Sequence, residues 1–184
     1  YMLADEVGLG KTIEACSVLK IYLSNKSKKR ILITVPSALI AQWRTELLFK
    51  FGLIEGTNEN DNHIKLVSVE ELKRKLVESN WDFLVVDEVH NYLNNTEFYE
   101  NVHQLSRNSE NVILLSATPI QQRQEEYLKL LRLILPEKYD EMTENDFANL
   151  VEKQNRISRL TYSLLDEMDS FKNELLPEIE SDDP

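Results

Sequence analysis

The sequence predicts an α/β protein with an open, mostly parallel sheet and helices on both of its faces. Two observations carry this prediction. Short apolar runs alternate with segments of helical spacing through the first 136 residues, and strands that alternate with helices imply parallel units with right-handed crossovers. The runs are also apolar at nearly every position, as is typical of strands that helices cover on both sides.

In chain order, the expected strands are residues 1–4, 31–35, 64–67, 83–86 and 112–115. The expected helices are residues 12–23, 38–49, 70–77 and 97–105. Ser37 follows Pro36 and Thr96 precedes Glu97, and short hydroxyl side chains are favoured at helix N-caps. We therefore expect Ser37 and Thr96 to cap the second and the fourth of these helices.

The last quarter of the chain has a different composition, because Glu, Asp, Lys and Leu dominate and no strong strand is visible. Helices are expected at residues 144–153 and 158–175, before an acidic end. We therefore divide the chain into a body of residues 1–136 and an acidic helical connector, or the start of an insertion, over residues 137–184.

Charge and composition limit the possible classes of protein. With 42% hydrophobic and 29% charged residues, the chain is globular in composition. The net charge is −11, but 14 of the 32 acids and only 5 of the 21 bases lie in residues 137–184. The body is therefore close to neutral, which permits a nucleic-acid partner without favouring one.

Two further observations concern the cellular setting. The longest apolar stretch, residues 31–41, is too short and too polar to cross a bilayer, so no membrane association is expected. The single cysteine, Cys16, cannot form an internal disulfide, which favours a reducing compartment. We expect a cytoplasmic protein, associated with the nucleoid if it is bacterial.

A phosphate-binding loop is predicted where the first strand leads into the first helix. Residues 5–12 read Asp-Glu-Val-Gly-Leu-Gly-Lys-Thr, and glycines there let the backbone wrap closely around an anion. The N–H groups and the dipole of the following helix would point at the same anion. Lys11 would reach the β- and γ-phosphates, and the Thr12 hydroxyl would ligate Mg²⁺. The expected ATP-binding residues are Gly8, Leu9, Gly10, Lys11 and Thr12.

An acidic pair completes this expectation. Asp87 and Glu88 directly follow the apolar run of residues 83–86, and ligands of open parallel sheets bind at the carboxyl ends of the strands. Asp87 would hold Mg²⁺ through its coordinated water, and Glu88 would orient and deprotonate the attacking water. An acidic pair alone is often an ordinary solvated turn. Beside a phosphate loop, it predicts a catalytic site in which Glu88 and Lys11 act on ATP.

These motifs resemble those of superfamily 2 helicases. Residues 87–90 resemble the Asp-Glu-Ala-His motif II, with Val89 in place of alanine, and residues 114–119 resemble motif III. In that superfamily, motif III senses hydrolysis and relays it to the nucleic-acid track. The resemblance implies a RecA-like P-loop domain, and it implies that His90, Ser116 and Thr118 couple hydrolysis to movement.

Three stretches narrow the resemblance to Swi/Snf-type ATPases. Residues 5–12 are similar to their Asp-Glu-Met-Gly-Leu-Gly-Lys-Thr loop, which also lacks the usual first glycine. Residues 35–43 resemble their motif Ia, and residues 118–122 resemble their Thr-Pro-Ile-Gln-Asn, with Gln122 in place of asparagine. The Ser-Ala-Thr and Asp-Glu-Val-His sequences lean towards the bacterial branch typified by the RNA-polymerase-recycling ATPase. The resemblance covers residues 1–136.

The same resemblance implies a groove for nucleic acid, and double-stranded DNA is the expected partner. Ser37 and Gln42, after the second strand and on the next helix, would hold phosphates without reading bases. Ser68, after the third strand, is expected to play a similar role as motif Ib. Trp43, by contrast, is expected to pack its helix against the sheet.

Two features of the family have no counterpart in these 184 residues. The glutamine that contacts the nucleotide would precede residue 1, so the chain resembles a first lobe truncated at its N-terminus. No Gln-x-x-Arg-x-x-Arg stretch occurs, and in the family this stretch supplies the arginine finger from a second RecA-like lobe. We therefore expect that second lobe as a partner, and little ATPase activity from residues 1–184 alone.

Three functions remain open at this point. The first is the nucleotide-binding lobe of an ATP-dependent double-stranded DNA translocase that remodels protein–DNA complexes. The second is the same lobe in a strand-separating DNA or RNA helicase, which the Ser-Ala-Thr motif mildly favours. The third is a nucleotide-binding interaction module whose acidic end docks a protein, although the presence of Lys11, Thr12, Asp87 and Glu88 argues against a degenerate site.

Overall fold

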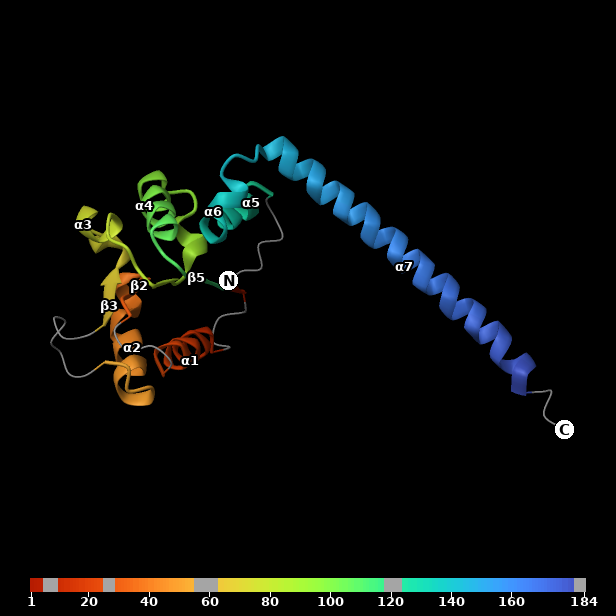
Figure 1. Ribbon diagram of the computed structural model, residues 1–184, viewed down its shortest axis with the longest axis horizontal. Helices are drawn as coiled ribbons and strands as arrows, with labels where there is room; N and C mark the ends of the chain where they lie inside the picture. Colours follow the sequence, from red (N-terminus) through yellow and green to blue (C-terminus); the bar gives the residue numbers. More distant parts are fainter. Residues whose placement is uncertain (5–9, 25–28, 55–62, 118–123, 181–184) are drawn as a thin grey trace. The chain divides into compact units, whose positions relative to one another are not determined.

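A computed structural model describes residues 1–4, 10–24, 29–54, 63–117 and 124–180, with side chains up to residue 170 (Figure 1). The chain forms two compact units, residues 1–141 and residues 142–184. The first unit contains the whole sheet and every candidate site residue. The division of the body from the connector at residue 136 stays a prediction.

The first unit is built on a five-stranded sheet in which all strands are parallel. Its order is β1-β5-β4-β2-β3. The strands are β1 (Met2–Ala4), β2 (Ile31–Val35), β3 (Ile64–Ser68), β4 (Phe83–Val86) and β5 (Val112–Ser116). The predicted α/β class is confirmed, and each expected strand lies within one residue of an observed one. Buried, almost continuously apolar strands explain this agreement.

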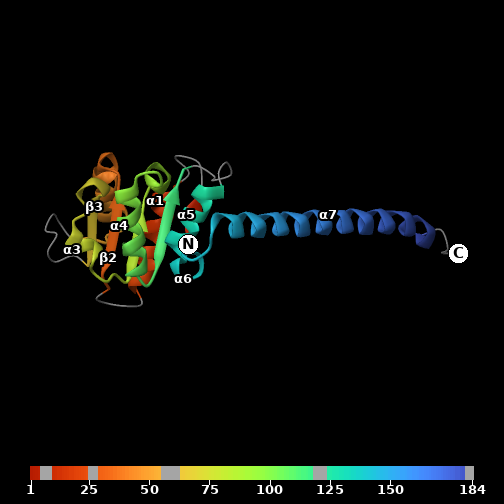
Figure 2. The same ribbon diagram turned by 90° about the horizontal axis from the view of Figure 1, so that it is seen from above.

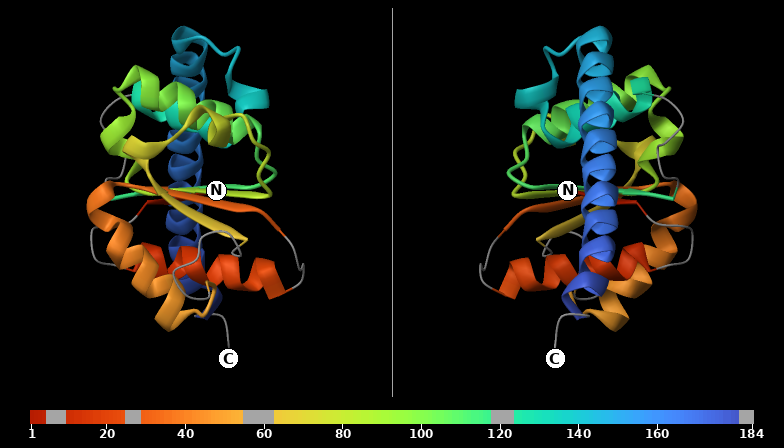
Figure 3. Two further views of the ribbon diagram at one scale, coloured as in Figure 1. Left: turned by 90° about the vertical axis from the view of Figure 1, so that its left-hand side faces the viewer. Right: turned by 90° about the vertical axis from the view of Figure 1, so that its right-hand side faces the viewer.

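Helices cover both faces of the sheet (Figure 3). On one face, α1 (Lys11–Ser24) and α2 (Ile40–Thr45) bury Cys16, Leu19 and Trp43. On the other face, α4 (Thr96–Arg107) and α5 (Gln124–Ile134) bury apolar side chains of their own. Short helical segments complete the unit: η1 (Ser37–Leu39), η2 (Glu46–Lys50), η3 (Val69–Glu71), α3 (Arg74–Val77), η4 (Val89–Tyr92) and α6 (Pro136–Tyr139).

Several local predictions were wrong. The expected cap Thr96 is the first helical residue of α4, and the Asn95 side chain caps the helix by accepting a hydrogen bond from the Phe98 N–H at 3.1 Å. The expected cap Ser37 makes no capping hydrogen bond, and Pro36 holds the N-cap position of η1. The expected helix 70–77 is interrupted because Leu72 is extended and packs against the core.

Two helices differ from expectation in extent. No helix was expected at α5, although its buried leucines recur at helical spacing. In the second unit, α7 (Glu144–Glu180) is one helix of 37 residues instead of two (Figures 1 and 2). Residues 154–157 contain no glycine or proline, so nothing there breaks the helix. Of the described helices, none is long and apolar enough to cross a membrane.

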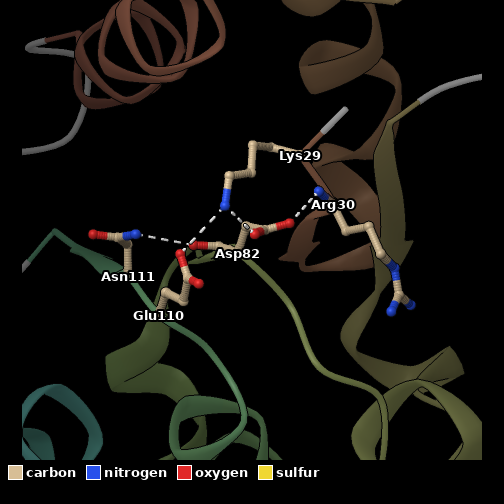
Figure 4. Close-up of polar contacts among 5 residues, drawn as sticks. All are labelled: Lys29, Arg30, Asp82, Glu110 and Asn111. Atoms are coloured by element: carbon tan, nitrogen blue, oxygen red, sulfur yellow. Dashed lines mark hydrogen bonds and ion pairs between the residues drawn. The ribbon is translucent and has the colours of Figure 1, made fainter. Parts of the chain in front are cut away.

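A network of hydrogen bonds around Asp82, the residue before β4, lies at the amino-terminal edge of the sheet (Figure 4). Lys29 Nζ lies 2.5 Å from Asp82 Oδ1, and the Arg30 backbone N–H donates to Asp82 Oδ2 at 2.6 Å. The Asn111 side chain donates to the Asp82 carbonyl oxygen at 3.0 Å. This network ties the start of β4 to the starts of β2 and β5.

Candidate nucleotide-binding site

The opposite, carboxyl-terminal edge of the sheet carries the candidate site. Because all the strands are parallel, the segments that follow β1, β4 and β5 emerge at this one edge. The segment after β1 leads to Gly10 and Lys11, and β4 is followed directly by Asp87 and Glu88. Ser116 ends β5, the strand that lies between the other two.

The described end of the predicted phosphate loop consists of Gly10 and the first turn of α1. Gly10 has φ +91°, a conformation that L side chains rarely adopt. Lys11 begins α1 and is only 8% exposed, and the Gly10 carbonyl accepts the first helical hydrogen bond, from the Glu14 N–H at 3.0 Å. Thr12 is partly buried in the first turn. Gly8 and Leu9, also expected to bind nucleotide, lie outside the described residues.

Asp87 is a buried carboxylate held by two donors. It is 4% exposed. Its Oδ2 accepts a hydrogen bond from the Trp43 indole Nε1 at 2.7 Å, and its Oδ1 accepts one from the Glu88 backbone N–H at 2.9 Å. Burial raises the pKa of Asp87 above its usual value, and the Glu88 charge adds to this, whereas the Trp43 hydrogen bond and the Lys11 charge oppose it. Lys11 therefore lies close enough for its charge to act on Asp87.

Glu88 has an unusual backbone. Its φ of 50° and ψ of 38° lie in the left-handed region, and no other non-glycine residue of the described segments has a positive φ. This conformation costs roughly 1–2 kcal/mol for an L-residue, and such costs concentrate at functional sites. The Asp87 carboxylate supports the turn by accepting the Glu88 N–H. The acidic pair therefore forms one constrained turn at the end of β4.

The Glu88 carboxylate approaches His90 and, through it, Ser116. Glu88 Oε2 is buried and has no hydrogen-bond partner among the described residues, although His90 Nδ1 lies 3.3 Å away as a possible ion pair. We regard this contact as electrostatic, because the same Nδ1 lies closer, at 3.1 Å, to Ser116 Oγ. The structure thus brings together three residues expected in catalysis and coupling. Thr118 lies outside the described residues.

The chemistry of this edge suits Mg²⁺ with a triphosphate. Mg²⁺ prefers oxygen ligands and is usually held by one or two carboxylates together with phosphates and water. The Asp87 carboxylate and the Thr12 hydroxyl are such ligands. Glu88 Oε2 has no hydrogen-bond partner among the described residues, so it keeps the capacity to accept one from a water molecule. The described residues therefore fit a Mg²⁺–nucleotide complex.

The residues expected to contact nucleic acid are divided between surface and interior. Ser37 and Gln42 are exposed, on η1 and α2. Ser68 is at the end of β3, level with Val35 of β2, but it is only 4% exposed. The contact roles of all three residues stay predictions, and Ser37 and Gln42 are the two that lie at the surface.

The hydrogen bond between Trp43 and Asp87 was not expected from the sequence. Trp43 is fully buried in the core, as its expected packing role requires. A buried indole N–H usually has a hydrogen-bond partner, and this general rule was the available signal. The sequence did not indicate which polar residue would be the acceptor. The acceptor is Asp87, 44 positions along the chain.

Comparison with known proteins identifies the family. The chain matches the SNF2-related domain over residues 1–53 and 56–178. It is 35% identical to the RNA polymerase-associated protein RapA of Cronobacter sakazakii over 83% of this chain, and 33% identical to RapA of Proteus mirabilis over 94%. These matches span 18% and 20% of the lengths of those relatives.

Solved structures are similar in fold. The SWI2/SNF2 ATPase core of Sulfolobus solfataricus, solved in complex with double-stranded DNA, has a TM-score of 0.67 and 24% identity, covering 80% of this chain and 33% of that one. The Hef helicase domain of Pyrococcus furiosus has a TM-score of 0.58 and 17% identity, covering 72% and 32%. The resemblance that the motifs suggested is confirmed. The chain belongs to the family of SNF2-related domains.

Proposed function

We propose that the chain is the first nucleotide-binding lobe of an ATP-driven motor that translocates on double-stranded DNA and remodels protein–DNA complexes. The observation that carries this proposal is the turn at the end of β4. There a buried Asp87, within reach of the Lys11 charge, is joined to a Glu88 whose Oε2 lacks a hydrogen-bond partner among the described residues. Family membership makes ATP the ligand of choice for this edge.

Each residue has a role in the proposed reaction. Lys11 would hold the β- and γ-phosphates, and the Thr12 hydroxyl and Asp87 would hold Mg²⁺, Asp87 through a coordinated water. When bound there, Mg²⁺ would supply positive charge against the charge that develops on the transferred phosphoryl group. Glu88 Oε2 accepts a hydrogen bond from the attacking water, orients it towards the γ-phosphate and takes its proton. The left-handed turn sets this carboxylate in place before substrate arrives.

His90 and Ser116 are proposed to couple hydrolysis to movement. His90 Nδ1 lies between Glu88 Oε2 and Ser116 Oγ, at 3.3 Å and 3.1 Å. A change in the charge or position of Glu88 therefore reaches the end of β5 through one imidazole ring. The chain beyond Ser116 continues into the motif III segment with Thr118, so this contact joins the hydrolytic turn to that segment.

Double-stranded DNA is the proposed track, and Ser37 and Gln42 are its proposed contacts on this lobe. The similar archaeal ATPase core was solved with double-stranded DNA, and the closeness of motif Ia to that of Swi/Snf-type enzymes points the same way. A second RecA-like lobe would supply the arginine finger and the other half of the track. The relatives are named for association with RNA polymerase, so a polymerase–DNA complex is the assembly to test first.

The test is ATP hydrolysis by a protein that carries this chain together with the second lobe. We expect duplex DNA to stimulate turnover more than single-stranded DNA or RNA does. Stimulation mainly by single strands would favour the strand-separating helicase, and absence of turnover would favour the interaction module. Residues 1–184 alone should hydrolyse ATP roughly 10³–10⁵ times more slowly, because an arginine finger contributes about that factor.

A further inference from the structure

Trp43 makes the shortest polar contact that Asp87 has within the described residues. Its Nε1 donates to Asp87 Oδ2 at 2.7 Å, whereas the Glu88 N–H donates to Oδ1 at 2.9 Å. Trp43 is fully buried and Asp87 is 4% exposed, so water does not compete strongly for either group. Hydrogen bonds to a charged acceptor in such a setting are stronger than neutral ones.

The two oxygens of the Asp87 carboxylate accept hydrogen bonds from two different elements. The Trp43 donor comes from α2, and the Glu88 donor comes from the turn after β4. Each carboxylate oxygen can accept about two hydrogen bonds, so each keeps room for one more partner, such as a metal-bound water. Without Trp43, Oδ2 would be a buried anion lacking one donor, and the carboxylate would lose the contact that limits its rotation.

Trp43 also lies beside a surface residue of the proposed DNA groove. Gln42 and Trp43 are consecutive on α2, and Gln42 is exposed whereas Trp43 is fully buried. A hydrogen bond of 2.7 Å weakens when its atoms shift by a few tenths of an ångström. Any displacement of α2 by a ligand on its exposed side would therefore change the support of Asp87.

We propose that Trp43 is a positioning residue for the Mg²⁺ site, holding Asp87 by its indole N–H and connecting the exposed surface of α2 to that site. This inference rests on the proposed function, because it takes Asp87 to be the residue that holds Mg²⁺. Support of a metal-binding group by a neighbouring donor typically affects metal affinity by about 10–100-fold.

The experiment compares Trp43→Phe with Leu47→Ala in the protein that carries both lobes. Leu47 is fully buried in the same core cluster, so Leu47→Ala weakens packing there and leaves both Asp87 donors in place. A fluorescent ADP analogue is titrated in EDTA and at increasing Mg²⁺ concentrations, and thermal unfolding is recorded for each variant. A third protein carries at position 43 a tryptophan analogue with sulfur in place of the indole N–H, which keeps the shape and removes only the donor.

Mg²⁺ should tighten binding of the ADP analogue, and we expect Trp43→Phe and the sulfur analogue to raise the Mg²⁺ concentration at which half of this effect is reached about tenfold. The affinity for the ADP analogue in EDTA should change less than about twofold. Leu47→Ala should lower the unfolding temperature without this shift. If Leu47→Ala shifts the Mg²⁺ dependence as much as Trp43→Phe, or if the sulfur analogue behaves like the unaltered protein, the positioning role is refuted. If the unaltered protein shows no Mg²⁺-dependent nucleotide binding, the proposed function itself fails.

Discussion

Strand β4 has an aspartate at each end, and the two aspartates have opposite surroundings. Asp82, at the amino-terminal edge, is paired with Lys29 and with the Arg30 N–H. Burial raises the pKa of Asp82, but these hydrogen bonds outweigh it and lower the pKa overall. Asp87, at the carboxyl-terminal edge, has a raised pKa because burial exceeds the effect of its donors.

The difference separates a carboxylate that stabilises the fold, Asp82, from the one that we propose holds a ligand, Asp87. The Asp82 network is complete within the protein, and it links three strands. The Asp87 turn includes a left-handed Glu88 and a buried Glu88 Oε2 that lacks a hydrogen-bond partner among the described residues. A cation with its water would relieve both the burial of the charge and the missing hydrogen bond.

The largest expected effect is on turnover. Glu88→Gln should leave ATP affinity nearly unchanged and reduce kcat about 10²–10⁴-fold, because only the water-activating charge is lost. Lys11→Ala should instead weaken ATP binding, since it removes a phosphate contact. Nucleotide titration and steady-state ATPase kinetics on the two-lobe protein measure both effects. Equal losses of affinity in the two variants would mean that Glu88 acts as a ligand and not as a base.

A smaller effect concerns the dependence of stability on pH. The charge of Asp82 stabilises the fold at neutral pH, and this stabilisation is lost as the pH falls below 3.8 towards the lowered pKa. The charge of Asp87 destabilises the fold as the pH rises above 3.8 through the raised pKa. Asp82→Asn should therefore lose less unfolding free energy than the unaltered protein between pH 7 and pH 3, and Asp87→Asn should lose more. Urea unfolding across this range measures the loss for each variant and for the unaltered protein, and two differences from the unaltered protein with the same sign would contradict the contrast.

The smallest effect tests the left-handed turn. Glu88→Gly and Glu88→Ala both remove the carboxylate, but glycine adopts a positive φ without steric cost. The glycine variant should be more stable than the alanine variant by about 1 kcal/mol, against the usual order at ordinary positions. Chemical unfolding of the two variants provides the comparison. A more stable alanine variant would show that the turn is not left-handed in solution.

The sheet and the acidic pair were predictable for a shared reason. Parallel strands buried on both faces are apolar along their length, so their ends are visible in the sequence, and ligand-binding residues follow those ends. The hydrogen bond between Trp43 and Asp87 was not predictable, because it depends on how α2 packs against the sheet. The left-handed backbone of Glu88 was not predictable either, because glutamate is not a residue type that favours this conformation.

The helical parts were predicted less well, because helix ends depend on weak and local preferences. Asn95 and Thr96 are both good N-caps, and their order alone did not decide between them. The continuity of α7 depended on the absence of breaking residues between 154 and 157, which is a weaker signal than a repeated apolar pattern.

The strand order also has a consequence for synthesis on the ribosome. β1 pairs only with β5 in the described sheet, with Met2 opposite Leu114, whereas β2, β3 and β4 pair among themselves. A nascent chain can therefore assemble β2, β3 and β4 early, whereas the pairing of β1 within the described sheet has to wait until residue 114 has emerged. Closing so long a loop is slow compared with local pairing. The pairing of β1 with β5 would thus be the last of the sheet's strand pairings to form, and the proposed nucleotide site would be complete only after the fifth strand.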